Sequence, residues 1–209
     1  MPAERQRRAV ARGDAARFDA AFYERFYRDA RTCVADSADT LKLARLVHAY
    51  LAYLDVPVRS ILDAGCGLGF WRDAAAALWP NAQYTGIEIS DFLCTTHGWT
   101  QASIVDYAPG RRFDLVICQS VLQYLDDRAA ARAIANLARL ARGAIYVEAP
   151  TREDWTRTCD KGRTDGEVHL RPAAWYRRRF ARHFVTAGAG VFVPRQGRAV
   201  LYALERAES

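Results

Sequence analysis

Residues 60–69 constrain the fold of this chain more than any other stretch. They read Ser-Ile-Leu-Asp-Ala-Gly-Cys-Gly-Leu-Gly, so a short apolar run ends in Asp63 and glycines follow at alternate positions. The next residues, 70–78, have high helix propensity. We therefore expect a strand, a tight turn and a helix, because glycine permits backbone angles that a β-carbon disfavours and lets a ligand approach the main chain. Free amides at the helix start favour an anionic or carbonyl-rich ligand.

The spacing of the glycines narrows the class of ligand. A dinucleotide fingerprint would need glycine where the chain has Phe70, and a phosphate-binding P-loop would need Gly-Lys-Ser/Thr, which Arg72 and Asp73 do not supply. The remaining pattern, Asp-x-Gly-x-Gly-x-Gly, resembles the cofactor loop of the class I S-adenosylmethionine-dependent methyltransferases. A nucleotide-dependent oxidoreductase stays as a distant alternative.

Further runs of the chain predict the rest of a sheet. We expect parallel strands at 60–63, 83–89, 103–107, 113–119 and 144–148, separated by helices that include 41–54 and 126–141. The apolar runs 190–194 and 199–204 are joined by so short a connection that they must be antiparallel. This arrangement resembles the class I methyltransferase fold. It implies an α/β, Rossmann-like, seven-stranded, mostly parallel sheet with an antiparallel C-terminal strand and helices on both faces.

The resemblance also implies a set of cofactor-binding residues. Glu88 ends the second predicted strand, 21 residues beyond Gly67, where an acid accepts both hydroxyls of a ribose. Asp106, at the end of the third predicted strand, is expected to accept the adenine amino group. Gln119 is expected to contact the amino-acid end of S-adenosylmethionine. The remaining residues expected to cradle the methionine part or flank the adenine ring are Asp63, Gly65, Gly67, Gly69, Ile89 and Tyr107.

Candidate catalytic and substrate residues lie in the second half of the chain and near its start. Residues 113–125 resemble the fourth-strand motif of small-molecule methyltransferases, so Tyr124 either faces the methyl-transfer site or is packed within a helix. His169 and Glu148 join it as candidate general bases, His169 because the pKa of histidine lies near neutrality. The polar stretch 149–170 is a candidate ligand loop. The residues predicted to contact the acceptor are Tyr27, Trp155, Arg163 and Tyr176.

Composition bounds the organisation of the protein. The 209 residues are 51% apolar and 26% charged, which predicts a single globular domain over 1–209, with residues 1–40 as an N-terminal helical extension or lid. Aromatic residues at 18, 22, 23 and 26 mark an amphipathic helix that either packs over the sheet or brings Tyr23 or Tyr27 over the cofactor. The scattered cysteines and the lack of a signal sequence or long apolar run favour a cytoplasmic protein without a metal site or membrane contact.

The acceptor of the methyl group is only partly constrained. Methyltransferases of exocyclic amines commonly carry Asn/Asp-Pro-Pro-Tyr/Phe after the fourth strand, where this chain has Gln-Ser-Val-Leu at 119–122. We therefore expect a small-molecule acceptor. The net charge of +6 leaves an RNA or protein methyltransferase as an alternative, although nucleic acid is not favoured. A non-catalytic module that binds S-adenosylmethionine is a further alternative, and the sequence predicts no oligomeric state.

Overall fold

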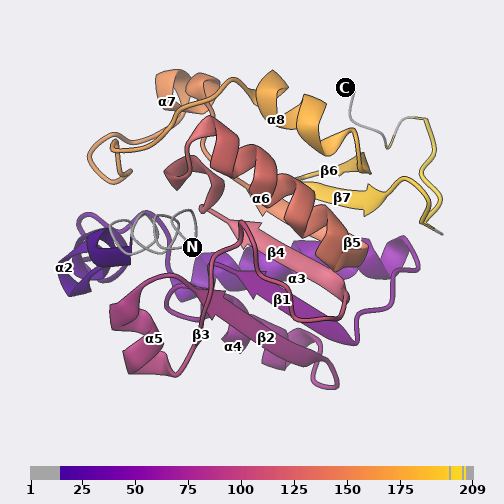
Figure 1. Cartoon of the computed structure of the whole chain (residues 1–209), viewed down its shortest axis with the longest axis horizontal. Helices are drawn as coiled ribbons and strands as arrows, with labels where there is room; N and C mark the ends of the chain where they lie inside the picture. Colours follow the sequence, from indigo (N-terminus) through magenta and orange to yellow (C-terminus); the bar gives the residue numbers. More distant parts are fainter. Residues whose placement is uncertain (1–14, 198, 204, 206–209) are drawn as a thin grey trace, which may run out of the picture.

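A seven-stranded sheet forms the centre of the computed structural model, which describes residues 15–197, 199–203 and 205 (Figure 1). The strands lie in the order β3-β2-β1-β4-β5-β7-β6. Each neighbouring pair from β3 to β5 is parallel, whereas β7 runs antiparallel to both β5 and β6. The predicted Rossmann-like sheet with one reversed strand near the C-terminus is therefore confirmed.

The elements follow the alternation expected of this fold. The strands are β1 (Ser60–Ala64), β2 (Gln83–Glu88), β3 (Thr100–Gln101), β4 (Phe113–Gln119), β5 (Ala141–Glu148), β6 (Phe184–Gly188) and β7 (Val191–Pro194). The α-helices are α2 (Ala20–Tyr23), α3 (Ser37–Tyr53), α4 (Phe70–Leu78), α5 (Asp91–His97), α6 (Asp127–Leu140), α7 (Arg152–Arg157) and α8 (Ala173–Phe180). A π-helix η1 (Glu24–Arg28) follows α2, and a 3-10 turn η2 (Leu122–Tyr124) follows β4.

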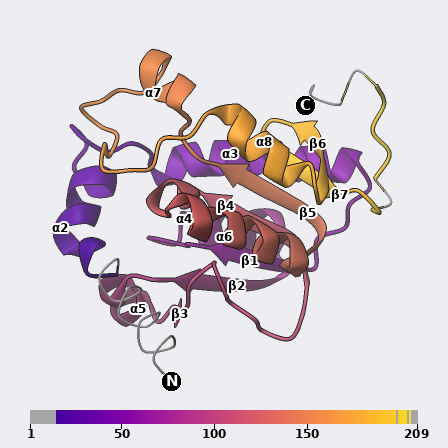
Figure 2. The ribbon, with the colours of Figure 1, turned by 45° about the horizontal axis from the view of Figure 1, so that its top comes forward.

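Helices cover both faces of the sheet, as Figure 2 shows. The apolar sides of α3 and α4 pack on one face around Ile61 and Leu115, and those of α6 and α8 pack on the other around Leu62 and Val116. Neighbouring residues of β1 and β4 thus enter opposite layers, as the two-residue period of a strand requires. Because both faces are covered, β4 is buried along nearly its whole length, which explains why residues 115–118 are all apolar.

Two predicted strands are wrong in position. The third strand is Thr100–Gln101, while residues 103–107 form a turn in which the amides of Asp106 and Tyr107 both bond to the carbonyl of Ser103. A strand ending in Asp106 therefore does not exist. The β-branched run Ile-Val had suggested extended backbone, but this edge of the sheet offers only a two-residue pairing with β2.

The predicted strand at 190–194 is observed as β7, but its partner in the C-terminal hairpin is β6 rather than the run 199–204, of which residue 204 lies outside the described residues. The turn of this hairpin uses positive φ at Gly188, Ala189 and Gly190, so glycine supplies the left-handed conformations that join the strands. Residues 199–203 form no strand, and Val200 and Tyr202 are exposed. The apolar character of that run was the misleading signal.

The described part of the N-terminal extension forms a short α-helix that continues into a π-helix. Residues 1–14 of the predicted 1–40 extension lie outside the described residues. Within the rest, α2 and η1 lie beside α5, away from the body of α3 (Figures 1 and 2). Phe18, Tyr23 and Leu93 are the buried residues of an aromatic cluster that joins this segment to α5. Among the residues described, no helix has the length and apolar character needed to cross a bilayer.

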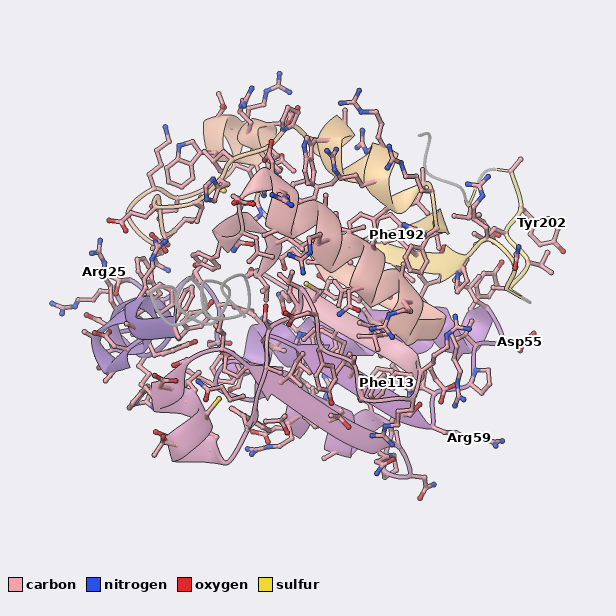
Figure 3. The ribbon with its side chains drawn as sticks, in the orientation of Figure 1. Arg25, Asp55, Arg59, Phe113, Phe192 and Tyr202 are labelled. Carbon is pink, nitrogen blue, oxygen red and sulfur yellow. The ribbon has the colours of Figure 1, made fainter. Side chains whose placement is uncertain are left out.

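The two ends of the sheet have different surroundings, which can be followed in Figure 3. Arg59 and Phe113, where β1 and β4 begin, lie at the end of the molecule that also carries Asp55 and Tyr202. Arg25 of the N-terminal segment lies at the opposite end. The carboxyl ends of the parallel strands therefore face the N-terminal segment, and in open α/β sheets that edge is where ligands bind.

Candidate active site

A cavity of about 290 Å³ lies at the carboxyl ends of the strands and under the N-terminal segment. Its volume is at the lower end of the roughly 300–1,000 Å³ typical of small-molecule sites. Residues that follow β1, β2, β3 and β4 line its floor, together with Glu148 at the end of β5. Of the residues predicted to bind cofactor or acceptor, or to catalyse, it brings together Asp63, Gly65, Gly67, Glu88, Ile89, Gln119, Tyr124, Tyr27 and Glu148.

The glycine loop is held by backbone bonds that leave one side open to the cavity. The amides of Gly65 and Cys66 both donate to the carbonyl of Ile87 on β2, at 2.9 and 3.0 Å. A β-carbon on Gly65 would lie 2.4 Å from the Val121 side chain, so no larger residue fits there. A β-carbon on Gly67 would meet no atom within 4 Å, because that position faces the open cavity. The loop thus forms a cradle into which a ligand can fit closely.

Glu88 has a more elaborate setting than its sequence position indicates. Its Oε2 accepts from the amide of Gly67 at 2.9 Å, and its Oε1 accepts from the amides of Ile89 and Ser90 at 2.7 and 3.0 Å. The side chain is only 5% exposed, yet it lines the cavity. Three backbone donors therefore hold the carboxylate in one orientation.

Ser90 connects Glu88 to the N-terminal segment. Its amide donates to Glu88, while its fully buried hydroxyl donates to the carbonyl of Phe18 at 2.5 Å. The same hydroxyl oxygen caps α5 by accepting from the amide of Leu93. Ser90 thus joins the acid through its backbone amide, and the start of α5 and the segment above the cavity through its hydroxyl.

Asp63 is buried near the end of β1, and among the described residues its carboxylate has one hydrogen-bond partner, the hydroxyl of Tyr84, at 2.6 Å. Burial, and to a smaller extent the negative charge of Glu88, raises the pKa of Asp63 to about 7, although the bond from Tyr84 opposes this shift. Burial and the adjacent Asp63 also raise the pKa of Tyr84, so Tyr84 stays a donor. Asp63 is therefore expected to change its protonation state near neutral pH.

A chain of hydrogen bonds crosses from α4 to β5 at the other end of the cavity. The Trp71 indole Nε1 donates to Gln119 Oε1 at 2.6 Å, and Gln119 Nε2 donates to Glu148 Oε2 at 2.7 Å. The Ser120 hydroxyl donates to Glu148 Oε1 at 3.2 Å. Because Trp71 can only donate, it determines which end of the Gln119 amide points toward Glu148. These contacts aim the Glu148 carboxylate.

Aromatic side chains of the N-terminal segment, which we call the lid (residues 15–28), form the roof of the cavity. Phe18 and Phe22 pack edge-on against Tyr124, with ring centroids 4.9 and 6.3 Å apart. Burial raises the pKa of Tyr27 to about 12, helped by the charge of Glu148, and burial also raises the pKa of Tyr124. Both hydroxyls stay protonated at neutral pH, so they are suited to donate hydrogen bonds rather than to act as bases.

An ion pair ties the lid to the loop that precedes α8. Arg17 Nη2 lies 2.7 Å from Asp165 Oδ2 and 3.4 Å from the Glu167 carboxylate, and Nη1 donates to the Glu167 carbonyl at 2.7 Å. The guanidinium also lies over the Tyr124 ring, 5.3 Å from its centroid. We call the Arg17–Asp165 contact the latch, because it joins two segments that are far apart in sequence at the cavity roof.

Several predicted site residues lie outside the cavity lining. Asp106 is exposed in the turn after β3, and Tyr107 uses its carbonyl to accept from Asn136. Gly69 begins α4 with φ of 85° and does not line the cavity. The turn instead brings Ser103 to the lining, together with its neighbours Ala102 and Ile104. The expected adenine contact of Asp106 thus finds no support in this geometry, because it depended on a strand at 103–107.

The predicted residues of stretch 149–170 also lie elsewhere. His169 is exposed, and its amide donates to the carbonyl of Gln123, so the structure does not bring its imidazole to the cavity. Arg163 is exposed and 3.8 Å from Asp160. Trp155 is half-buried against Lys161, whose ammonium lies 5.9 Å from the ring centroid. Only the backbone and acids of this stretch approach the lid, through the latch.

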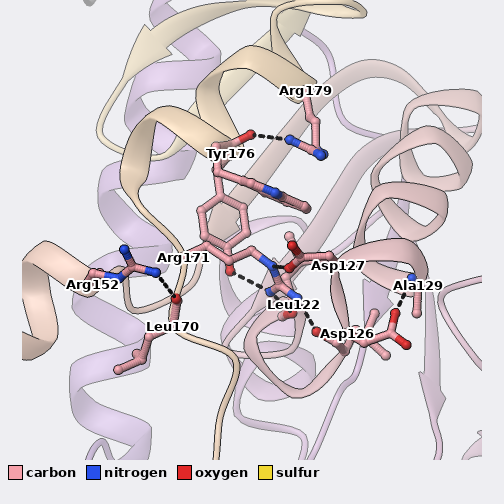
Figure 4. Close-up of polar contacts among 11 residues, drawn as sticks. Leu122, Asp126, Asp127, Ala129, Arg152, Leu170, Arg171, Tyr176 and Arg179 are labelled. Atoms are coloured by element: carbon pink, nitrogen blue, oxygen red, sulfur yellow. Dashed lines mark hydrogen bonds and ion pairs between the residues drawn. The ribbon is translucent and has the colours of Figure 1, made fainter.

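Tyr176 belongs to a buried arginine site rather than to the acceptor pocket (Figure 4). Arg171 is 3% exposed and lies 2.7 Å from Asp127, with Nη1 donating to the Leu122 carbonyl at 3.1 Å and to the Tyr176 hydroxyl at 3.2 Å. A further bond reaches the Leu125 carbonyl. This network anchors η2 and the start of α6, and so positions Tyr124 from behind.

Sequence reasoning missed the residues that support the site. Trp71 and Trp99 are among them: Trp99 Nε1 donates to the Gly67 carbonyl at 2.9 Å and holds the glycine loop from behind. Arg17 was missed because its role depends on a partner far away in the chain. A tryptophan directly after the glycine loop, in place of a small residue, was the available signal for Trp71.

The charges of the cavity lining are mostly negative. Its charged members are Arg17, Asp63, Glu88 and Glu148, and Arg17 already binds Asp165 and Glu167. Arginines of stretch 149–171 do not compensate, because none of them lines the cavity. The site therefore favours a ligand with positive charge.

Comparisons with known proteins agree with this geometry. A family model described as a methyltransferase domain matches residues 35–189, and no curated protein matches significantly. DesVI of Streptomyces venezuelae has a TM-score of 0.58 and 19% identity, over 75% of this chain and 92% of that chain. The sugar N-methyltransferase KedS8 of a Streptoalloteichus species has a TM-score of 0.58 and 20% identity, over 73% and 87%. An S-adenosylmethionine-dependent methyltransferase of Clostridium acetobutylicum has a TM-score of 0.57 and 12% identity, over 78% and 84%.

Proposed function

This chain belongs to the methyltransferase domain family, and from that premise we propose that it transfers a methyl group from S-adenosylmethionine to a small-molecule acceptor. The observation that carries the proposal is the Glu88 carboxylate, fixed by three amides beside the open face of Gly67. An acid at the end of the second strand accepts the two hydroxyls of a ribose, and the glycine loop leaves room for the methionine part of the cofactor.

The order of the strands gives the orientation of the cofactor. Glu88 at the end of β2 would hold the ribose, with Ser103 and Ile104 after β3 near the adenine and the loop after β1 around the methionine part. When bound, S-adenosylmethionine supplies an activated methyl group on a sulfonium, so the protein mainly has to align an acceptor and exclude water. The lid provides that exclusion through Phe18 and Phe22.

The acceptor would enter at the β4–β5 end of the cavity. Glu148 is the candidate base there, and Tyr27 and Tyr124 are candidate hydrogen-bond donors to the acceptor. The small volume and the roof closed by the latch favour a small molecule over RNA or a folded protein, whose backbone would need an open groove. His169 lies outside this geometry.

Isothermal titration with S-adenosylhomocysteine, the demethylated product, tests the proposal. The Glu88→Gln variant should bind about tenfold more weakly or worse, because the new amide group places a donor against a backbone donor and withdraws the ribose acceptor. Glu153→Gln, at an exposed site on α7, is the matched control and should bind like the wild type. Equal affinity of Glu88→Gln and wild type would refute the assignment of the site.

A further inference from the structure

Glu148 is a carboxylate without a cationic partner at the acceptor end of the cavity. Among the described residues it takes part in no ion pair, and its hydrogen-bond donors are the neutral groups of Gln119 and Ser120. The exposed Glu148 side chain lines the same cavity as Tyr27. A negative charge that faces a cavity with aromatic walls favours an ammonium group.

Hydrogen bonds from neighbouring side chains fix the orientation of the Glu148 carboxylate. Trp71 is 4% exposed and anchored on α4, and its indole fixes Gln119, which in turn holds Glu148 Oε2. Ser120, at φ of 55°, holds the other oxygen, and this uncommon backbone conformation turns its hydroxyl toward β5. Trp71, Gln119 and Ser120 thus hold the Glu148 carboxylate in one orientation.

We propose, on the basis of the proposed function, that the methyl acceptor is an amine and that Glu148 binds its ammonium group, with Trp71 and Gln119 as positioning residues. The geometry separates this role from that of the cofactor. Glu88 and the glycine loop occupy the ends of β2 and β1, whereas Glu148 ends β5, on the far side of β4. Acidic or phosphorylated acceptors are disfavoured, because Arg17, the one cationic side chain that the described part of the chain contributes to the lining, is held in the latch.

The same carboxylate accounts for the proton that amine chemistry requires. The bound ammonium gives one proton to Glu148, which frees the nitrogen lone pair to form the new bond to carbon. As the carbon–nitrogen bond forms, the carbon–sulfur bond of the donor would break and its electron pair would stay on sulfur, which becomes neutral. The product nitrogen carries the positive charge as a methylated ammonium, and Glu148 releases its proton to water. No further reactant is needed.

Matched probes test the proposal by binding. With S-adenosylhomocysteine at saturation, ligand-observed NMR and calorimetry would compare benzylamine, benzyl alcohol and benzoate, which share one ring and differ in the polar group. Benzylamine should bind about tenfold more tightly than the other two, since a hydrogen bond to a charged group contributes more than a neutral one. Glu148→Gln should abolish this preference and leave the affinity for S-adenosylhomocysteine within about twofold.

Trp71→Phe separates positioning from direct contact. It keeps the ring on α4 but removes the indole donor, so the preference for benzylamine should fall only in part, and circular dichroism should report an unchanged fold. Glu24→Gln, an exposed acid of the lid, is the control for loss of charge and should keep the full preference.

Each other outcome overturns the proposal. Equal binding of the alcohol and the amine, failure of benzylamine to bind, or a preference that survives Glu148→Gln would refute the amine assignment. A loss of S-adenosylhomocysteine affinity in Glu148→Gln as large as the loss of benzylamine affinity would assign Glu148 to the cofactor's own ammonium group instead. Failure of wild-type protein to bind S-adenosylhomocysteine would refute the proposed function itself.

Discussion

The protonation of Asp63 predicts a distinctive dependence of stability on pH. Its pKa is about 7 in the folded protein and near 3.8 in the unfolded chain, so between these values the folded state holds a proton that the unfolded state has released. The free energy of unfolding must therefore fall as the pH rises through this window and level off above pH 7. The difference between the two pKa values corresponds to a loss of about 4 kcal/mol in the free energy of unfolding. About 3 kcal/mol of this loss falls between pH 5 and pH 8.

Asp63→Asn isolates this contribution. Asparagine has nearly the same shape, its carbonyl oxygen can accept from the Tyr84 hydroxyl, and it cannot ionise. Urea unfolding of the ligand-free proteins should give an advantage of the variant over wild type that is larger at pH 8 than at pH 5 by about 3 kcal/mol. Taking the difference between the two proteins at each pH removes the titration of all other groups.

Two results would contradict the prediction for Asp63→Asn. Parallel stability curves for the two proteins from pH 5 to pH 8 would show that Asp63 ionises normally and that its burial has been misread. A variant that is less stable than wild type at pH 8 would show that the ionised carboxylate is needed by the fold. Tyr84→Phe adds a check, since loss of the donor should move the fall in stability to higher pH.

Two further predictions concern the buried arginine and the latch. Arg171→Leu should lower the free energy of unfolding by about 3–5 kcal/mol, because two carbonyls and Asp127 lose their partner. Arg163→Leu, at an exposed site, is the control. A loss below about 1 kcal/mol in Arg171→Leu would contradict the importance of the network. Asp165→Asn should speed the dissociation of S-adenosylhomocysteine several-fold in stopped-flow experiments, while shifting the stability by less than about 1 kcal/mol. High salt should reproduce this change in wild type, and an unchanged dissociation rate would show that the latch does not restrain the lid.

The sequence was sufficient for the central features of this fold because they depend on local patterns. The strand at 113–119 was predicted with its observed bounds, since a run buried on both faces has a distinctive composition. Glu88 was placed correctly at the end of β2 because the distance from the glycine loop follows from one helix and one strand. The edges were harder: Phe184–Gly188 became a strand and 199–203 did not, because pairing with β7 rather than apolar content decides between them.

Parts of the site depended on contacts that no local pattern contains. Arg17 meets Asp165 across most of the chain, and Trp71 reaches Glu148 through Gln119 only because α4, β4 and β5 converge. Conversely, His169 had suitable chemistry but not a suitable position, since its backbone is tied to Gln123 outside the lining. The chemistry of each side chain could be inferred from the sequence, whereas the fold was needed to show which side chains meet at the cavity. The assignment of residues 1–209 to one domain stays a prediction.

Ser90 has a consequence for the order of events in turnover. Ser90 bonds to Glu88 through its amide and to the carbonyl of Phe18 through its hydroxyl. A nucleoside bound by Glu88 should therefore also restrain the lid segment that carries Phe18. Binding of the donor should therefore make the wall against which an acceptor rests more rigid. Steady-state kinetics should accordingly follow a compulsory sequence, donor first and acceptor second, with the spent donor the last to leave.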